Sequence, residues 1–251
     1  MKTVFINCSP KKKFCASAYF LFLQSLSVKG KKVTEKLRNP SDHQRILEQI
    51  RDARTVIFGV PLYVDGVPSH VLRFMEAMET FCRENGIHLN VYVVANNGFI
   101  EGKQNEPLMQ IFSNFCTRAG LTFGGGVGIG GGVMLNVTRI LFIVDIAMLI
   151  LNLIITAVNG GNLLAWDLWE SFLVNAAWII YLNLGLLVYL FRMGSFINKG
   201  TDAGKKYTRI LIPSFIFILF ADVFFVIIST IEGGIFRGWL AKKHYEGKEN
   251  S

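Results

Sequence analysis

The feature that most constrains this chain is a change in polarity at the glycine-rich run 124–132, Gly-Gly-Gly-Val-Gly-Ile-Gly-Gly-Gly. Before this run, short apolar segments alternate with charged amphipathic ones, which is typical of a water-soluble α/β domain. After it, three long apolar stretches are separated by short polar loops, which is typical of a chain in a lipid bilayer. We therefore predict a soluble domain at 1–132, a membrane region at 133–232 and a basic tail at 233–251.

The net charge of +8 is divided unevenly between these parts. Residues 1–133 hold 16 Lys and Arg against 10 Asp and Glu, a balance of +6. The positive charges are dispersed apart from Lys11–Lys13, and no nucleic-acid-binding motif is present, so nucleic acid is not an expected partner. Two explanations of the basic balance stay open, namely an anionic inner leaflet beside the domain and a phosphorylated ligand. The four cysteines form no C-x-x-C pair, which favours free thiols in a reducing compartment over a metal site.

The soluble part alternates between strands and helices. We expect strands at 3–7, 32–37, 55–60, 89–95 and 121–129, and helices at 16–28, 42–53, 69–84 and 104–119. This order predicts a parallel sheet with helices on both faces, in which ligands bind beyond the carboxyl ends of the strands. The loops to examine are therefore Ser9–Ser17, Pro61–Pro68 and Asn96–Gly102. The apolar run at the N-terminus is too short for a signal peptide, so we expect this domain in the cytoplasm.

These three loops carry groups suited to a phosphorylated ring compound. Ser9, Ser17 and the first amides of the helix at 16–28 can donate hydrogen bonds to a phosphate, and Lys11–Lys13 and the helix dipole favour its charge. A solvated basic turn is the alternative. Tyr63 can stack on a flat ring or simply fill the core. Asn96-Asn97-Gly98 can bind the polar edge of a ring or form a plain β-turn.

Three segments together resemble the flavodoxin-like NADPH-dependent FMN reductase family: 7–11 (Asn-Cys-Ser-Pro-Lys), 58–70, and 97–105 running on to 115–120 and the glycine run. The resemblance covers residues 1–132. It implies a doubly wound five-stranded parallel sheet of order 2-1-3-4-5, non-covalent FMN and NAD(P)H as electron donor. It implies no protein nucleophile, because the cofactor carries the chemistry. Soluble relatives are commonly dimers, so a homodimer is a further expectation.

The resemblance places the FMN phosphate in the loop 9–17 and the isoalloxazine ring against the loops 61–65 and 96–99. The predicted cofactor-binding residues are Ser9, Lys11, Lys13, Cys15, Ala16, Ser17, Pro61, Leu62, Tyr63, Val64, Asp65, Asn96, Asn97, Gly98 and Phe99. Two departures from the family pattern stand out. Cys8 occupies a position that is usually glycine, and the fifth strand runs directly into the apolar part, where the family has a helix that covers the sheet.

The apolar part predicts three transmembrane helices, at 133–158, 170–191 and 210–231. Residues 171–191 carry no charge over 21 positions, enough to cross the hydrocarbon core. With a cytoplasmic N-terminal domain, the loop 159–167 lies outside and has no Lys or Arg, whereas the loop 192–209 lies inside and has five. This agrees with the positive-inside tendency, although the basic tail disagrees with it.

Two carboxylates interrupt the apolar segments. Asp145 and Asp222 belong either to a proton path or to structural contacts, with Arg139 beside Asp145 and with Asn175 or Asn183 beside Asp222. Residues 133–243 contain no histidine, which excludes bis-histidine haem ligation within these segments.

The sequence favours a membrane-anchored FMN-dependent NAD(P)H oxidoreductase, multi-pass in the cell membrane with its N-terminal domain in the cytoplasm. Its electron acceptor is unidentified, and a lipid-soluble quinone is one option. The alternatives are a flavodoxin-like electron carrier docked to a membrane partner, which uses no NAD(P)H, and an interaction protein whose flavin fold has decayed.

Overall fold

The computed structural model describes residues 1–11, 15–63 and 66–231. The predicted site residues Lys13, Val64 and Asp65 and the predicted tail 233–251 lie outside these ranges. The strands are β1 (Lys2–Asn7), β2 (Lys31–Lys36), β3 (Thr55–Pro61), β4 (Asn90–Asn96), β5 (Thr122–Gly130) and β6 (Lys205–Arg209). The helices are α1 (Ala16–Ser27), α2 (His43–Ile50), α3 (Ser69–Glu84), α4 (Glu106–Ala119), α5 (Gly132–Val158), α6 (Trp166–Lys199) and α7 (Ser214–Ile231), with 3-10 turns η1 (Pro40–Asp42) and η2 (Gly102–Asn105).

The strands form one parallel sheet of order β2-β1-β3-β4-β5-β6. The predicted order 2-1-3-4-5 is confirmed for the first five strands, and it is the flavodoxin-like order. The predicted count of five was wrong, because β6 adds a sixth strand beside β5 within a stretch expected to be a loop. Three of the five residues of β6 are charged, so it lacks the apolar pattern of a buried strand.

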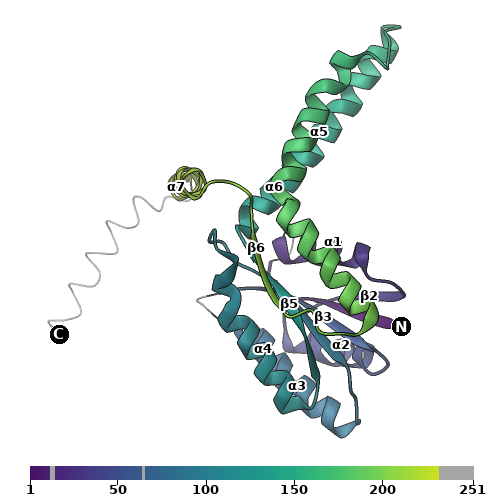
Figure 1. Cartoon of the computed structure of the whole chain (residues 1–251), viewed down its shortest axis with the longest axis vertical. Helices are drawn as coiled ribbons and strands as arrows, with labels where there is room; N and C mark the ends of the chain where they lie inside the picture. Colours follow the sequence, from purple (N-terminus) through teal and green to yellow (C-terminus); the bar gives the residue numbers. More distant parts are fainter. Residues whose placement is uncertain (12–14, 64–65, 232–251) are drawn as a thin grey trace, which may run out of the picture. The chain divides into compact units, whose positions relative to one another are not determined.

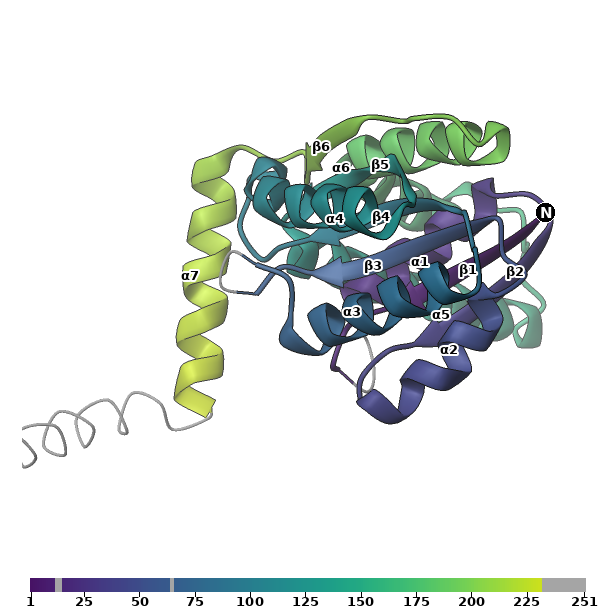
Figure 2. The ribbon, with the colours of Figure 1, turned by 90° about the horizontal axis from the view of Figure 1, so that it is seen from below.

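Helices cover both faces of the sheet (Figures 1 and 2). One face packs against α2, α3 and α4 through alternate strand residues, among them Val4, Val56, Phe58 and Val93, all fully buried. The opposite face packs against α1 and the C-terminal half of α6. In the sequence, no helix that covers the sheet follows the fifth strand directly. In the structure, α6 covers this face instead.

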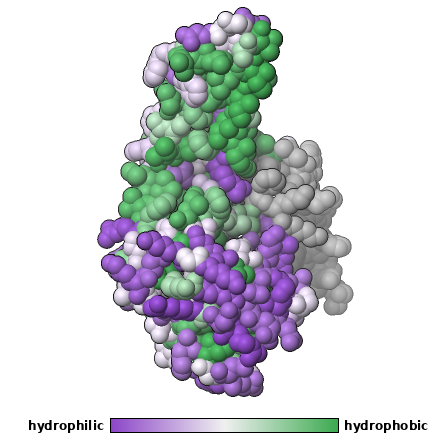
Figure 3. Space-filling model, turned by 90° about the vertical axis from the view of Figure 1, so that its right-hand side faces the viewer, coloured by the Kyte–Doolittle hydropathy of each residue, from purple (hydrophilic) through white to green (hydrophobic). Residues whose placement is uncertain are grey.

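Helices α5 and α6 form an antiparallel hairpin that projects beyond the sheet (Figure 1). Polar and aromatic contacts join the two helices. Asn183 Nδ2 donates to Thr138 Oγ1 at 3.0 Å, and Phe142 stacks on Phe172. Asn175 Nδ2 donates to Asp145 Oδ1 at 3.0 Å, whereas the sequence offered Asn175 or Asn183 as a partner for Asp222. On the face shown in Figure 3, hydrophobic residues cover this hairpin and hydrophilic ones gather on the sheet domain.

The predicted boundary at residue 132 stays a prediction. In the structure, one compact unit runs from Met1 to Leu211, and a second begins at Ile212. The reason is the second half of α6, where Leu186, Leu190, Met193 and Ile197 are buried. The predicted cytoplasmic loop 192–209 is therefore the end of a core helix followed by an edge strand.

Among the described residues, two helices, α5 and α6, are long and apolar enough to cross a membrane, with 27 and 34 residues. The third predicted segment is α7 in the second unit, where Ser214–Val223 counts as a shorter apolar helix. The three predicted spans and the multi-pass topology stay predictions. Because α5 leaves β5 and α6 leads back to β6, any crossing by this hairpin returns the chain to the side of the sheet.

Candidate functional site

A cavity of about 220 Å³ lies at the carboxyl ends of the strands, where the three loops singled out in the sequence meet. Eleven of the fifteen predicted residues line it. They are Ser9, Lys11, Cys15, Ala16, Ser17, Pro61, Leu62, Tyr63, Asn96, Asn97 and Gly98, joined by Val133. Phe99 is not part of the lining, and its side chain is 60% exposed. The geometry thus brings the predicted residues together, while their role in cofactor binding stays a prediction.

The first helix presents its amino end to this cavity. Cys15 is its N-cap residue and makes no capping hydrogen bond through its side chain. The first N–H groups of a helix have no partners within the helix, and they attract anions. Arg38 Nη2 donates to the carbonyl of Lys11 at 2.9 Å, which ties the segment after β2 to the same loop. This arrangement suits a phosphate group.

The two serines differ in what they can donate. Ser17 is buried and its hydroxyl already donates to Asn96 Oδ1 at 2.8 Å, so it links the first turn of α1 to β4. Ser9 Oγ accepts from the Lys11 amide at 3.4 Å, which leaves its hydroxyl hydrogen free to donate. The sequence had treated both serines as phosphate donors, and the structure favours Ser9.

Asn97 holds a buried acceptor at the cavity. Its Nδ2 donates to the Glu101 carbonyl at 3.0 Å, and its backbone binds Ile129 and Gly132. The side chain is 3% exposed, and its Oδ1 has no hydrogen-bond partner among the described residues. An unsatisfied buried acceptor costs about 1–3 kcal/mol. A ligand N–H group would relieve this cost, which is the clearest sign that the cavity fits a polar ring edge.

Tyr63 stands at the mouth of the cavity. Its backbone pairs with Gly66 in both directions, at 3.2 and 3.0 Å, which fixes the turn after β3. The side chain is 42% exposed, so it is not core filler. Partial burial raises the pKa of the Tyr63 phenol, which therefore stays neutral at physiological pH. A neutral aromatic face is thus available for stacking.

Cys8 stands where the resembled family usually has glycine, and its side chain points into the core. Its side chain is fully buried within the core that packs against α2 and α3, and burial raises the pKa of its thiol. Its amide donates to the Gly59 carbonyl at 2.9 Å, and its own carbonyl pairs with His70 Nε2 at 2.9 Å. The thiol is thus a core group rather than a reactive one.

Sequence reasoning missed Val133, which lines the cavity from the first turn of α5. We had assigned it to the membrane region. Ligands bind beyond the carboxyl ends of parallel strands, and this rule could have found Val133 as well, because Val133 follows the carboxyl end of β5.

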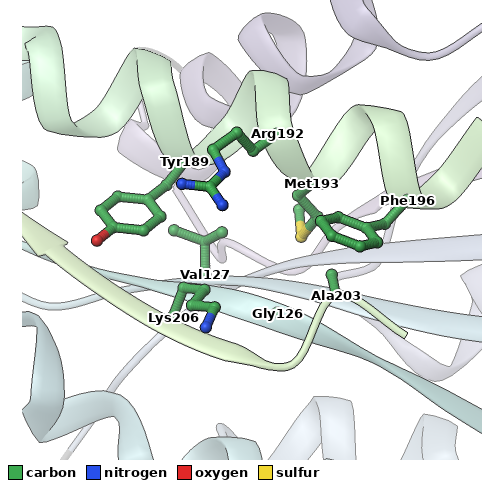
Figure 4. A pocket seen from close by; sticks show the side chains of 8 residues that line it. All are labelled: Gly126, Val127, Tyr189, Arg192, Met193, Phe196, Ala203 and Lys206. Carbon is green, nitrogen blue, oxygen red and sulfur yellow. The ribbon is translucent and has the colours of Figure 1, made fainter. Parts of the chain in front are cut away.

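A second cavity, of about 150 Å³, lies between α6 and strands β5 and β6 (Figure 4). Its walls are mainly apolar, with Val127, Met193 and Phe196 among them, and Arg192 and Lys206 stand at its side. It lies away from the strand ends and includes none of the predicted residues. The strand-end cavity is therefore the candidate site.

The fold and this cavity define a doubly wound parallel α/β protein with a cleft at its strand ends. No protein-family model and no curated protein matches the chain. Among solved structures, it is similar to the Trp repressor binding protein from Bacillus subtilis, at 20% identity and a TM-score of 0.43, over 51% of this chain and 84% of that one.

Two further solved structures are similar over 52% of this chain. An NADPH-quinone reductase from P. pentosaceus is 13% identical, with a TM-score of 0.42 and 86% of its own chain covered. An azoreductase from Bacillus anthracis is 12% identical, with a TM-score of 0.39 and 87% of its own chain covered. At these values the likeness does not by itself assign an activity to this chain.

Proposed function

We propose that this chain is a membrane-anchored flavoprotein that passes electrons from NAD(P)H to an acceptor through bound FMN. The observation that carries the proposal is the strand-end cavity. It combines an uncapped helix amino end, an exposed aromatic ring and a buried amide oxygen without a partner. The sequence resemblance of 7–11, 58–70 and 97–105 to flavodoxin-like FMN reductases supports the same ligand.

The residues divide into two groups around such a cofactor. The Ser9 hydroxyl, Lys11 and the first amides of α1 would hold the phosphate. Tyr63 would cover one face of the ring, and Asn97 Oδ1 would accept a hydrogen bond from a ring N–H group. Bound FMN would supply the two-electron chemistry, so the protein needs no nucleophile of its own. The protein's part is to bind and orient the ring and to keep one side of it open.

The hairpin supports an acceptor that is dissolved in the membrane. Val133 lines the cavity and is the second residue of α5, so the hairpin leaves the domain at the same edge of the sheet as the cleft. A bilayer around the hairpin would place the mouth of the cleft near the headgroups. A quinone or another apolar electron acceptor could then reach the ring without leaving the lipid.

Flavin content and flavin reduction test this proposal. Full-length protein in nanodiscs should retain FMN, and NADPH or NADH should bleach its absorbance in a stopped-flow experiment. A combined Ser9→Ala, Ser17→Ala and Tyr63→Ala variant should lose most of the cofactor, and Phe99→Ala, outside the cavity lining, is the matched control. A protein that stays colourless in excess FMN contradicts the proposal. Retained FMN that neither nucleotide reduces would favour the electron carrier instead.

A further inference from the structure

The second cavity, between α6, β5 and β6, is lined mainly by apolar side chains (Figure 4). On α6, Tyr189, Met193 and Phe196 face it from positions i, i+4 and i+7, which lie on one side of a helix. The opposite wall is shallow, because Val127 stands between two glycines of β5 and Ala203 has only a methyl group. The cavity volume is about 150 Å³, and an apolar cavity of this size accepts a benzene ring.

Two cations reach this cavity from different elements. Figure 4 shows the Arg192 side chain coming from α6 and the Lys206 side chain coming from β6. Both residues are exposed, and neither side chain forms an ion pair or a hydrogen bond with the residues that the structure describes. Asp202 is the acidic residue nearest to them in the sequence, and its Oδ1 accepts from the Gly204 amide at 2.7 Å. The positive charge at the cavity is therefore not balanced by a carboxylate of the described chain.

The geometry of β6 explains why Lys206 differs from the other basic residues of this strand. Lys205 pairs with Glu106 at 2.9 Å, and Arg209 pairs with Glu101, so both project away from α6. Successive side chains of a strand point to opposite faces, and Lys206 therefore projects toward α6 and the cavity. The strand thus places two of its three cations on carboxylates and directs the third to an apolar space.

An apolar space beside two unbalanced cations defines the chemistry of its ligand. Apolar walls with a few convergent polar groups are the usual composition of a small-molecule site. A guanidinium group and an ammonium group both bind carboxylate and phosphate oxygens, and the guanidinium can do so with two parallel hydrogen bonds. An inorganic anion would leave the apolar walls without contacts, and a neutral hydrocarbon would leave the charges unmatched. A molecule that combines an anionic group with an apolar body matches both features.

We propose that this cavity binds a small organic anion. The apolar body of the ligand, about the size of a benzene ring, lies between Val127 and Phe196, and its carboxylate or phosphate group binds Arg192 and Lys206. The bound anion would bridge α6, β5 and β6. The proposal does not depend on the cofactor, because this cavity and the strand-end cavity share no lining residue.

Calorimetric titration of the full chain in nanodiscs of zwitterionic lipid tests the two parts of the ligand separately. Benzoate carries both parts, benzamide keeps the ring without the charge, and acetate keeps the charge without the ring. Benzoate should bind at least about tenfold more tightly than either of the other two. Phenyl phosphate in the same titration compares the two anionic groups, and tighter binding of either one supports the proposal. Absent benzoate binding, or equal affinities for acetate and benzoate, would overturn it.

Variants locate the binding site. Arg192→Gln with Lys206→Gln should weaken benzoate binding at least about tenfold. The matched control, Lys29→Gln with Lys199→Gln, removes the same charge from exposed positions outside the cavity and should bind normally. Ala203→Leu fills the cavity and keeps both cations, so it should weaken benzoate more than acetate. Equal benzoate affinities in the two double variants would overturn the proposal. If the Arg192 and Lys206 variant instead loses co-purifying phosphatidylglycerol and keeps its benzoate affinity, the site binds a lipid headgroup and the proposal is wrong.

Discussion

Tyr63 lies where the strand β3 ends and is the aromatic residue that lines the candidate site. Its exposed ring has no role in the core, so removing it should affect ligand binding more than folding. Aromatic stacking contributes about 0.5–1.5 kcal/mol. We therefore expect Tyr63→Ala to weaken FMN binding roughly 3- to 10-fold, with Tyr63→Phe close to wild type. Flavin fluorescence titration measures the FMN affinity of both variants. An unchanged affinity in Tyr63→Ala would show that the Tyr63 ring does not contact the flavin.

The four cysteines should be unreactive in the folded protein. All are buried, and burial raises the pKa of Cys82 to about 11 and of Cys116 to about 12. The thiolate is the reactive form, and a raised pKa keeps the thiols of Cys82 and Cys116 neutral below pH 9. Labelling with a thiol reagent at pH 8 should therefore be slow in native protein and reach four thiols per chain in denaturant. A thiol that reacts within seconds in the native state would contradict this.

At the scale of single residues, the rule that ligands bind beyond the carboxyl ends of parallel strands located the three loops from the sequence, and eleven residues of these loops line one cavity. The rule works because the carboxyl ends of parallel strands share one edge of the sheet. It could not show that Ser17 donates to Asn96, since that bond depends on how α1 packs beside β4. Nor could it pair Asn175 with Asp145, which depends on the register of two helices 30 residues apart.

The contact between α1 and α6 depends on a glycine. A Cβ atom at Gly194 would overlap the side chain of Ser27 and come within 3.1 Å of the Ser27 carbonyl oxygen. We expect Gly194→Ala to destabilise the fold by about 1–3 kcal/mol, as overpacking of a core contact commonly does. Ser195→Ala, one residue further and exposed, is the control and should change stability by less than about 0.5 kcal/mol. Urea unfolding in detergent compares the two, and equal stability would show that α1 can move aside.

At the scale of elements, the sequence predicted the first five strands and the four helices between them to within a few residues. It failed at α6 and β6 for physical reasons. In α6, Leu186, Leu190 and Met193 are buried against the sheet, and these are the same residue types that face lipid in a membrane helix. Hydropathy therefore cannot separate a half of α6 that packs on the sheet from a half that would cross a membrane. The strand β6 is short and charged, and Tyr207 and Arg209 reach Glu106 and Glu101 across a hundred residues.

At the scale of the whole molecule, the structure makes the sheet domain depend on the chain beyond the hairpin. A fragment of residues 1–132 would lack β6 and the half of α6 that covers one face, so β5 would become an open edge. Exposed edges and bare apolar faces lead to aggregation. We expect this fragment to aggregate and residues 1–211 to fold, as size-exclusion chromatography in detergent would show. A monodisperse, folded 1–132 fragment would contradict the six-stranded unit.

The hairpin, by contrast, should be removable from that unit. Thr138 and Asn183 hydrogen-bond across the base of the hairpin at 3.0 Å, so a short glycine linker can join Arg139 to Leu182 in place of 140–181. The sheet, its covering half of α6 and the strand-end cavity all stay in the shortened chain. We expect residues 1–211 to sediment with membranes after expression, and the same chain without 140–181 to be soluble and to bind FMN equally well. A shortened chain that still sediments with membranes, though folded by circular dichroism, would show that another surface of the domain holds it there.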